Sequence, residues 1–229
     1  RLLIMKYKKI RVSYDTEVTG NVNGVYSVEI KDSLSFKSKE DKKYFEGFFL
    51  KNSKDYNRVM IDDFKCIDVN KIQEICFFPV RKKIKEIDMI DFCPFKLGLD
   101  FLISKKLFDI MNNFNLPPVN KIPTRINTFN TEYFLIGFPM IPQERIDLNK
   151  SIFFDTKKRS EFNLKSYDAF INTDFSVKPR KIYPDVFYDV DTIGFQGKGL
   201  FFSDRLIDAI QDAGIVGLHV DDTEMEMNP

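Results

Sequence analysis

Three aspartates near residue 190 have the spacing that metal chemistry requires. Asp189 and Asp191 are two residues apart, so a strand would present both carboxylates on one face. Asp185 lies four residues upstream of Asp189. Clustered carboxylates can hold a divalent cation that activates water for hydrolysis. A metal-dependent hydrolase using Asp185, Asp189 and Asp191 is therefore one hypothesis, and plain exposure to solvent explains the same residues equally well.

Other catalytic patterns are incomplete. Gln196 stands where the proline–aspartate nuclease pattern that begins at Pro184-Asp185 needs its second carboxylate. His219 is the only histidine, and its alternating neighbours predict an outward-facing strand residue rather than a catalytic base. Ser104 and Ser203 each precede an amphipathic segment, so helix capping explains them better than nucleophilic chemistry. We expect that the chain has no catalytic residues and is not an enzyme.

Cofactor and metal signatures are equally weak. The three cysteines, Cys66, Cys76 and Cys93, form no CxxC pair, and one histidine adds little to a zinc site. We expect buried, reduced thiols. The glycine run 194–199 lacks the Lys-Ser/Thr order of a phosphate loop. The sequence therefore predicts no cofactor and no bound metal.

The composition describes a folded chain with almost no net charge. The 229 residues carry 35 Lys and Arg against 34 Asp and Glu, and 43% are hydrophobic. This apolar content excludes a disordered chain. A net charge of +1 argues against a partner such as nucleic acid or an anionic membrane. The densest basic cluster, residues 81–85, is interpreted as a solvated strand edge, with contact to nucleic acid or an acidic protein as the alternative.

The sequence also bears on where in the cell the protein is located. No apolar run approaches the ~18 residues of a membrane-spanning helix, and no signal peptide is visible. We expect a cytoplasmic protein. Because the chain begins at Arg1 rather than Met, a trimmed signal and a periplasmic location stay open.

The residue pattern predicts an α+β fold, mainly antiparallel sheet, with two Ser-capped amphipathic helices packed on it. The helices begin after Ser104 and Ser203. Residues 25–30 alternate as a strand after an Asn23-Gly24 turn, and residues 186–193 are predicted as another strand. The chain divides into a β-rich part, 1–95, and an α/β part, 96–229, or forms one continuous domain.

The two helical segments are similar to each other. A constant offset of 99 aligns Ser104 with Ser203, Leu107 with Leu206 and Asp109 with Asp208. Each segment reads as an apolar strand, a serine cap, an amphipathic helix, a short turn and a second strand. An internal duplication and one supersecondary motif used twice both explain this pattern.

These segments also resemble a known family. Leu200 to Val220, reading LFFSDRLIDAIQDAGIVGLHV, resembles the closing motif of a bacterial immunity-protein family first found in myxobacterial polymorphic-toxin loci. His219 departs from it, because an aromatic residue is commoner there. Asp100 to Tyr133 resembles the central motif of the same or a sister immunity family. The resemblance covers about a quarter of the chain.

The resemblance implies a protective function. Such proteins are encoded beside a secreted toxin, bind it in kin cells and block it by occlusion without catalysis. An adaptor module of a secretion system is a further alternative. The final residues carry the acids Asp221, Asp222, Glu224 and Glu226 and no Lys or Arg. They are predicted either to meet a basic toxin or to form a flexible, solvated tail.

Overall fold

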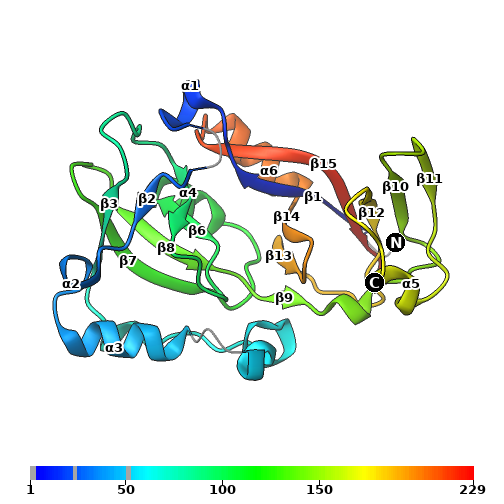
Figure 1. Cartoon of the computed structure of the whole chain (residues 1–229), viewed down its shortest axis with the longest axis horizontal. Coiled ribbons are helices and arrows are strands. Elements are labelled where there is room, and N and C mark those ends of the chain that lie inside the picture. Colours follow the sequence, from blue (N-terminus) through cyan, green and yellow to red (C-terminus); the bar gives the residue numbers. More distant parts are fainter. Residues whose placement is uncertain (1–3, 23–24, 50–52) are drawn as a thin grey trace.

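The computed structural model describes residues 4–22, 25–49 and 53–229, and its strands form two mixed sheets (Figure 1). Eight strands form one sheet, in the order β11-β10-β12-β15-β1-β14-β13-β9. Along the chain they are β1 (Met5–Val12), β9 (Met140–Ile141), β10 (Ile152–Asp155), β11 (Ser160–Phe162), β12 (Val177–Ile182), β13 (Thr192–Phe195), β14 (Gly199–Ser203) and β15 (Leu218–Met227).

The second sheet is nearly closed into a barrel. Its seven strands have the order β4-β6-β8-β7-β3-β2-β5. Its two end strands, β4 and β5, are separated along the chain by Asp91 alone, so the ends of the sheet meet and little edge is left unpaired. The strands are β2 (Val28–Glu29), β3 (Ile75–Pro79), β4 (Met89–Ile90), β5 (Phe92–Cys93), β6 (Phe101–Ser104), β7 (Asn120–Ile126) and β8 (Tyr133–Gly137).

The helices are short. The α-helices are α1 (Thr16–Thr19), α2 (Asp32–Ser35), α3 (Lys39–Phe48), α4 (Lys105–Met111), α5 (Tyr167–Ile171) and α6 (Asp204–Asp212). The 3₁₀ helices are η1 (Ser53–Val59), η2 (Ile61–Asp63), η3 (Val69–Lys71) and η4 (Gln143–Arg145). In the described part of the chain, no helix has the length and apolar content needed to cross a membrane.

The predicted α+β class and both serine caps are confirmed. Ser104 Oγ accepts a hydrogen bond from the Leu107 amide (3.1 Å), and Ser203 Oγ accepts one from the Leu206 amide (3.3 Å). Of the thirteen strand pairings in the described residues, nine are antiparallel and four parallel, so both sheets are mixed. Strands from both sides of residue 95 contribute to each sheet.

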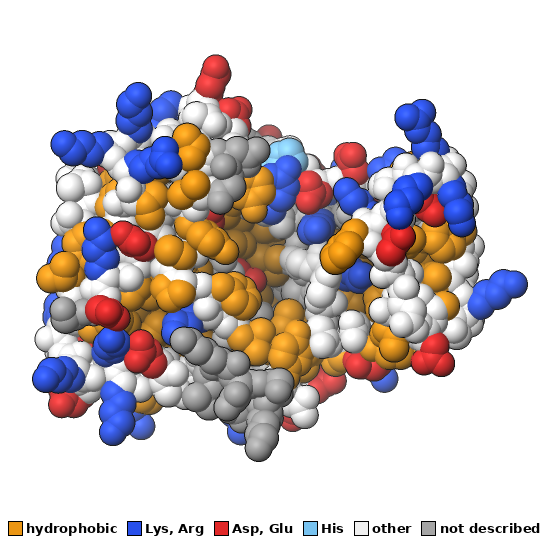
Figure 2. All heavy atoms as spheres, in the orientation of Figure 1, with side chains coloured by type: hydrophobic (Ala, Val, Ile, Leu, Met, Phe, Trp, Pro, Cys, Tyr) orange, Lys and Arg blue, Asp and Glu red, His pale blue; other side chains and the backbone are white. Residues whose placement is uncertain are grey.

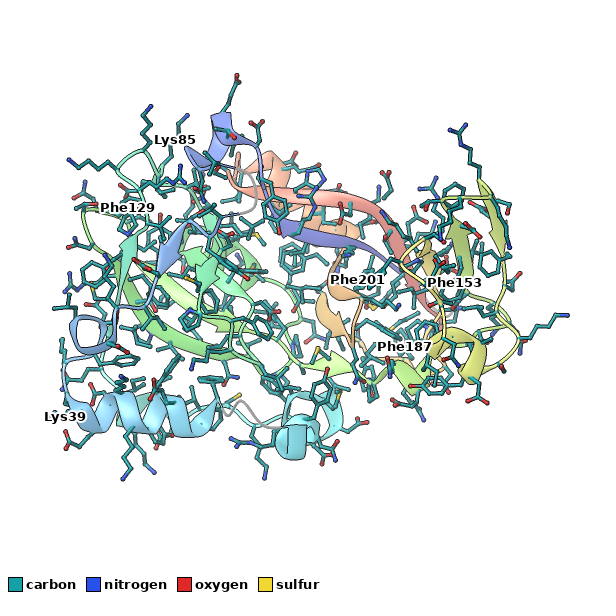
Figure 3. All side chains as sticks on the ribbon, viewed as in Figure 1. Lys39, Lys85, Phe129, Phe153, Phe187 and Phe201 are labelled. Atoms are coloured by element: carbon teal, nitrogen blue, oxygen red, sulfur yellow. The ribbon has the colours of Figure 1, made fainter. Side chains whose placement is uncertain are left out.

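One core joins the two sheets through the two Ser-capped helices. Leu107 of α4 and Leu206 of α6 are fully buried in it, together with side chains of β6 and β14. A second core fills the near-barrel, and a third includes Phe153 and Phe201 (Figure 3). Phe201 and Phe202 point into different cores, so β14 is covered on both faces.

The two helical units are structural repeats of larger extent than the sequence offset indicates. The neighbouring strands β4-β6-β8-β7-β3 correspond to β13-β14-β1-β15-β12, with the same parallel or antiparallel sense at every step. The central strand differs in origin. In the first repeat β8 follows β7 directly, whereas in the second repeat β1 comes from the start of the chain.

Two predicted strands are wrong in extent. The alternation over residues 25–30 yields only β2, Val28–Glu29, and the Asn23-Gly24 turn lies outside the described residues. The strand predicted for residues 186–193 begins later, as β13 at Thr192. The Asp191 amide donates to the carbonyl of Asn115 (2.6 Å) rather than to a neighbouring strand, and the pairing with β14 begins at Thr192.

Candidate functional site

The acidic end of the chain is a strand. Leu218–Met227 forms β15, which pairs with β1 on one side and β12 on the other, so the prediction of a flexible tail is wrong. Two of the acids lie opposite lysines on the neighbouring strands: Glu224 lies opposite Lys8 and Lys181, and Glu226 lies opposite Lys6. Opposite charges on neighbouring strands stabilise a pairing. This pairing could not be predicted from the sequence, because both partner strands are distant from β15 along the chain.

An open groove crosses β15 on the face that carries α6. Its floor is formed by β1, β15 and β12, and its walls by the end of α6 and by the β10–β11 hairpin. The volume is about 710 Å³. We call it the sheet groove; its lining residues are Lys8, Ile152, Glu161, Arg180, Lys181, Gln211, Val220, Asp221, Asp222 and Glu224.

The sheet groove carries both signs of charge in alternation. Arg180 lies between two acids, with Nε 3.7 Å from Glu161 Oε1 and Nη1 4.0 Å from Asp222 Oδ2. Asp222 is the most exposed of these three residues, since its side chain is 96% exposed. Exposed pairs of this kind contribute about 0–1 kcal/mol to stability. Their carboxylates and guanidinium therefore stay available to exchange partners.

A deeper ion pair stands beside the groove. Lys181 Nζ lies 2.7 Å from Glu226 Oε2, and both side chains are mostly buried. The hydrogen bond to Glu226 raises the pKa of Lys181 further above its ordinary value. A smaller hollow of about 200 Å³ continues from here past Lys6 to Asp204, at the start of α6. All four acids named by the sequence thus line the groove or the hollow, and Asp221 also binds Arg11 (3.2 Å).

The three aspartates of the hydrolase hypothesis do not converge on one site. Asp191 is fully buried, and both of its carboxylate oxygens accept hydrogen bonds from Arg205 (2.6 and 2.7 Å). Asp185 pairs with Arg145 at 3.0 Å, and Asp189 is exposed. Within residues 4–22, 25–49 and 53–229, no group of three potential His, Cys, Asp or Glu ligands converges. The predicted trio is thus divided among separate structural contacts.

Asp191 instead joins the two repeats. Its carboxylate also accepts hydrogen bonds from Ser203 Oγ (2.5 Å), which caps α6, and from the Asn115 amide (2.9 Å), which follows α4. Burial raises the pKa of Asp191, but the hydrogen bonds from Arg205, Ser203 and Asn115 outweigh burial and leave it below its ordinary value. The carboxylate therefore remains ionised at neutral pH.

Asp88 makes the matching contacts in the other repeat. Its carboxylate accepts a hydrogen bond from Ser104 Oγ (2.6 Å), the cap of α4, and from the Val216 amide (2.9 Å), which follows α6. Tyr133 donates to the carbonyl of Ile87, as Tyr7 donates to the carbonyl of Val190, both at 2.8 Å. Each repeat therefore caps its own helix and holds the segment after the helix of the other repeat.

The remaining candidates have ordinary surroundings. His219 is a half-exposed strand residue 3.4 Å from Asp221, in agreement with the outward-facing prediction. Cys76 is buried, but Cys66 is exposed and Cys93 half-buried, so the prediction of three buried thiols holds only in part. Burial raises the pKa of the Cys66 and Cys76 thiols, which disfavours the reactive thiolate.

The sequence missed the basic half of the sheet groove. Lys8, Arg180 and Lys181 come from two strands whose alternating cations, Lys6-Tyr7-Lys8 and Lys178-Pro179-Arg180, are a visible signal of a charged strand face. Only the pairing of β1 and β12 with β15 brings these cations beside the acids.

No protein-family model matches the chain, and no curated protein matches it either.

Proposed function

We propose that this chain is an immunity protein that binds a cognate secreted bacterial toxin and neutralises it by occlusion. The observation that carries the proposal is the sheet groove, an open surface of about 710 Å³ on which cations and anions alternate. A surface with both signs of charge rejects most partners by repulsion and selects one with the complementary pattern. Selective capture of a single toxin requires this property.

The floor of the groove supports tight binding because its backbone is ordered in advance. β15 has a hydrogen-bonded neighbour on each side, and the Lys181–Glu226 pair restrains two of the long side chains beside it. A partner that docks here does not have to order the main chain. The free energy of contact is therefore available for affinity.

The family resemblance supports the same function. The segment Leu200 to Val220, which resembles the immunity motif, forms β14, α6 and the first residues of β15. Gln211 of α6 and Val220 of β15 line the groove. The resembling segment therefore builds one wall and part of the floor of the proposed toxin-binding surface.

Reversal of one exposed groove charge is expected to weaken toxin binding. We expect Asp222→Lys to raise the dissociation constant at least about 10-fold, because a lysine would repel the cation that this carboxylate meets on a basic toxin. Because the Asp222 side chain is almost completely exposed, we expect the substitution to leave the fold unchanged. Asp63→Lys, an exposed acid of η2 outside the groove, is the matched control and should bind normally. Calorimetric titration of the purified toxin measures both.

The gene encoded beside this one supplies the decisive test. Cells that express the adjacent toxin domain together with this protein should survive, and the two proteins should elute as one complex. Killing despite soluble, folded protein contradicts the proposal. Truncation at residue 221 is not a suitable test, because it would remove most of a central strand.

A further inference from the structure

Strand β10 carries an aromatic side chain on the face that is turned away from its core. Phe153 and Phe154 are neighbours in β10, so their rings lie on opposite faces of the sheet. Phe153 is buried in the third core, whereas Phe154 is half-exposed and belongs to none of the three cores of the described residues. The ring of Phe154 is therefore available for burial against a partner.

A series of contacts joins Phe154 to the sheet groove. The Arg180 guanidinium lies 5.7 Å from the ring centroid of Phe154, and its Nε lies 3.7 Å from Glu161 Oε1. Glu161 and Lys178 lie directly opposite Phe154 on the two neighbouring strands, so their side chains share its face. We call Phe154, Glu161, Lys178 and Arg180 the hairpin face. Because Arg180 and Glu161 also line the sheet groove, the two surfaces are continuous.

The hairpin face belongs to a basic part of the chain. Residues 150–182 carry eight lysines and arginines against four aspartates and glutamates, although the whole chain has a net charge of only +1. Figure 2 shows several basic side chains projecting from the end of the molecule at which Figure 1 places β10 and β11. Within the groove, β12 contributes Arg180 and Lys181, whereas β15 contributes Asp222 and Glu224. A partner that lies across the groove must therefore present acids to the hairpin side and cations to β15.

Arg180 is positioned by contacts that leave its hydrogen-bond donors available. Its distances to Glu161 (3.7 Å) and Asp222 (4.0 Å) are longer than the roughly 2.8 Å of a direct bond between a guanidinium and a carboxylate. The side chain is also half-exposed. The Phe154 ring and the two acids thus hold the guanidinium in place, and a carboxylate from a partner can still approach it closely.

We infer that the toxin places an acidic side chain on Arg180 and an apolar side chain on Phe154, so that the hairpin face forms one half of the interface and the acids of β15 form the other. This inference rests on the proposed function. An arginine over an aromatic ring is typical of the residues that dominate protein interfaces, because its planar guanidinium binds a carboxylate through two parallel hydrogen bonds. A protein fits this face better than a nucleic acid does, because Glu161 and Asp222 would repel phosphates.

The test separates the guanidinium from its charge. We expect Arg180→Lys to raise the dissociation constant for the purified adjacent toxin at least about 10-fold, because lysine keeps the charge but cannot form two parallel hydrogen bonds. We expect Lys178→Glu to slow association at least about 10-fold at low salt. Lys82→Glu makes the same charge change in the basic cluster 81–85, which is an exposed turn rather than the predicted strand edge, and should bind like the wild type.

The aromatic contact has its own variant. We expect Phe154→Ala to weaken toxin binding about 10-fold, as the loss of a well-buried interface ring does. Thermal melting followed by circular dichroism shows whether this variant is folded. If it is not, Phe154→Leu keeps most of the apolar volume and is expected to weaken binding about 3-fold. Arg180 and Lys178 are exposed, so their variants should melt like the wild type.

The outcomes distinguish the two proposals. If Asp222→Lys weakens toxin binding while Arg180→Lys and Lys178→Glu bind within about 2-fold of the wild type, the hairpin inference is overturned and the proposed function stands. If the wild type does not bind the toxin, both fall. If Lys178→Glu loses binding to a labelled 20-nucleotide RNA but keeps toxin binding, the hairpin face is a nucleic-acid surface and the inference is overturned.

Discussion

Asp191→Ala is expected to lower the free energy of unfolding by about 2–4 kcal/mol, because the buried carboxylate accepts hydrogen bonds from Arg205, Ser203 and Asn115, of which only the half-exposed Arg205 can turn to solvent instead. The substitution leaves the Arg205 guanidinium, the Ser203 hydroxyl and the Asn115 amide without their shared acceptor. Because domains of this kind are stable by about 5–15 kcal/mol, the loss is a large part of the total. Urea denaturation followed by circular dichroism measures it.

The equivalent aspartate in the other repeat is the internal control. The Asp88 carboxylate accepts two hydrogen bonds from neutral donors, Ser104 and Val216, and forms no ion pair with the described residues. Asp88→Ala is therefore expected to cost only about 1–2 kcal/mol. Equal losses at Asp88 and Asp191 would show that the Arg205 pair contributes nothing, contrary to this account.

Low pH is expected to weaken the same contacts of the Asp191 carboxylate. The pKa of Asp191 in the folded protein lies below its ordinary value, whereas in the unfolded chain it is about 3.9. The ionised carboxylate therefore contributes its full stabilisation above about pH 4, and the contribution is lost as the pH falls through the folded-state pKa. The wild type should lose stability below pH 4 more steeply than Asp191→Ala. Parallel acid-unfolding curves would contradict this.

Removal of residues 1–12 is expected to abolish cooperative folding. β1 is the central strand of the second repeat, between β14 and β15. It buries Met5, Tyr7, Ile10 and Val12 almost completely, and four such side chains contribute roughly 6–12 kcal/mol. That amount equals the whole stability of a typical domain. Circular dichroism should show no sigmoidal melting transition for the truncated protein.

A circular permutant separates loss of the strand from loss of its position in the chain. Met5 pairs with Met227, so the two ends of the described chain lie side by side in β1 and β15 (Figure 1). A chain that runs from Tyr14 to Pro229 and then from Arg1 to Ser13 makes β15 and β1 a hairpin, as β7 and β8 already are. We expect it to fold to within about 2 kcal/mol of wild type, because it keeps every strand pairing. A molten permutant would contradict the equivalence of β1 and β8.

The two helices were predictable because their signals are local. A serine cap followed by apolar residues at helical spacing needs only one turn of chain to act, and both caps form as expected. The offset of 99 indicated the repeat for the same reason. Its central strand could not be predicted, because β1 and β8 occupy equivalent places from different points along the chain.

Only the acidic half of the candidate site could be predicted from the sequence. The acids of β15 stand together in the sequence, whereas Lys8 and Lys181 reach them through pairings that span more than 40 residues.

By itself, the sequence determined an α+β chain with balanced charge, two capped helices and an internal repeat, since composition, caps and periodicity act within a few residues. Only the tertiary structure decided that Asp191 binds Arg205 and Ser203 rather than a metal, and that the acidic end is a central strand. Both outcomes depend on long-range contacts, whose hydrogen bonds and ion pairs form only after distant strands have been placed side by side.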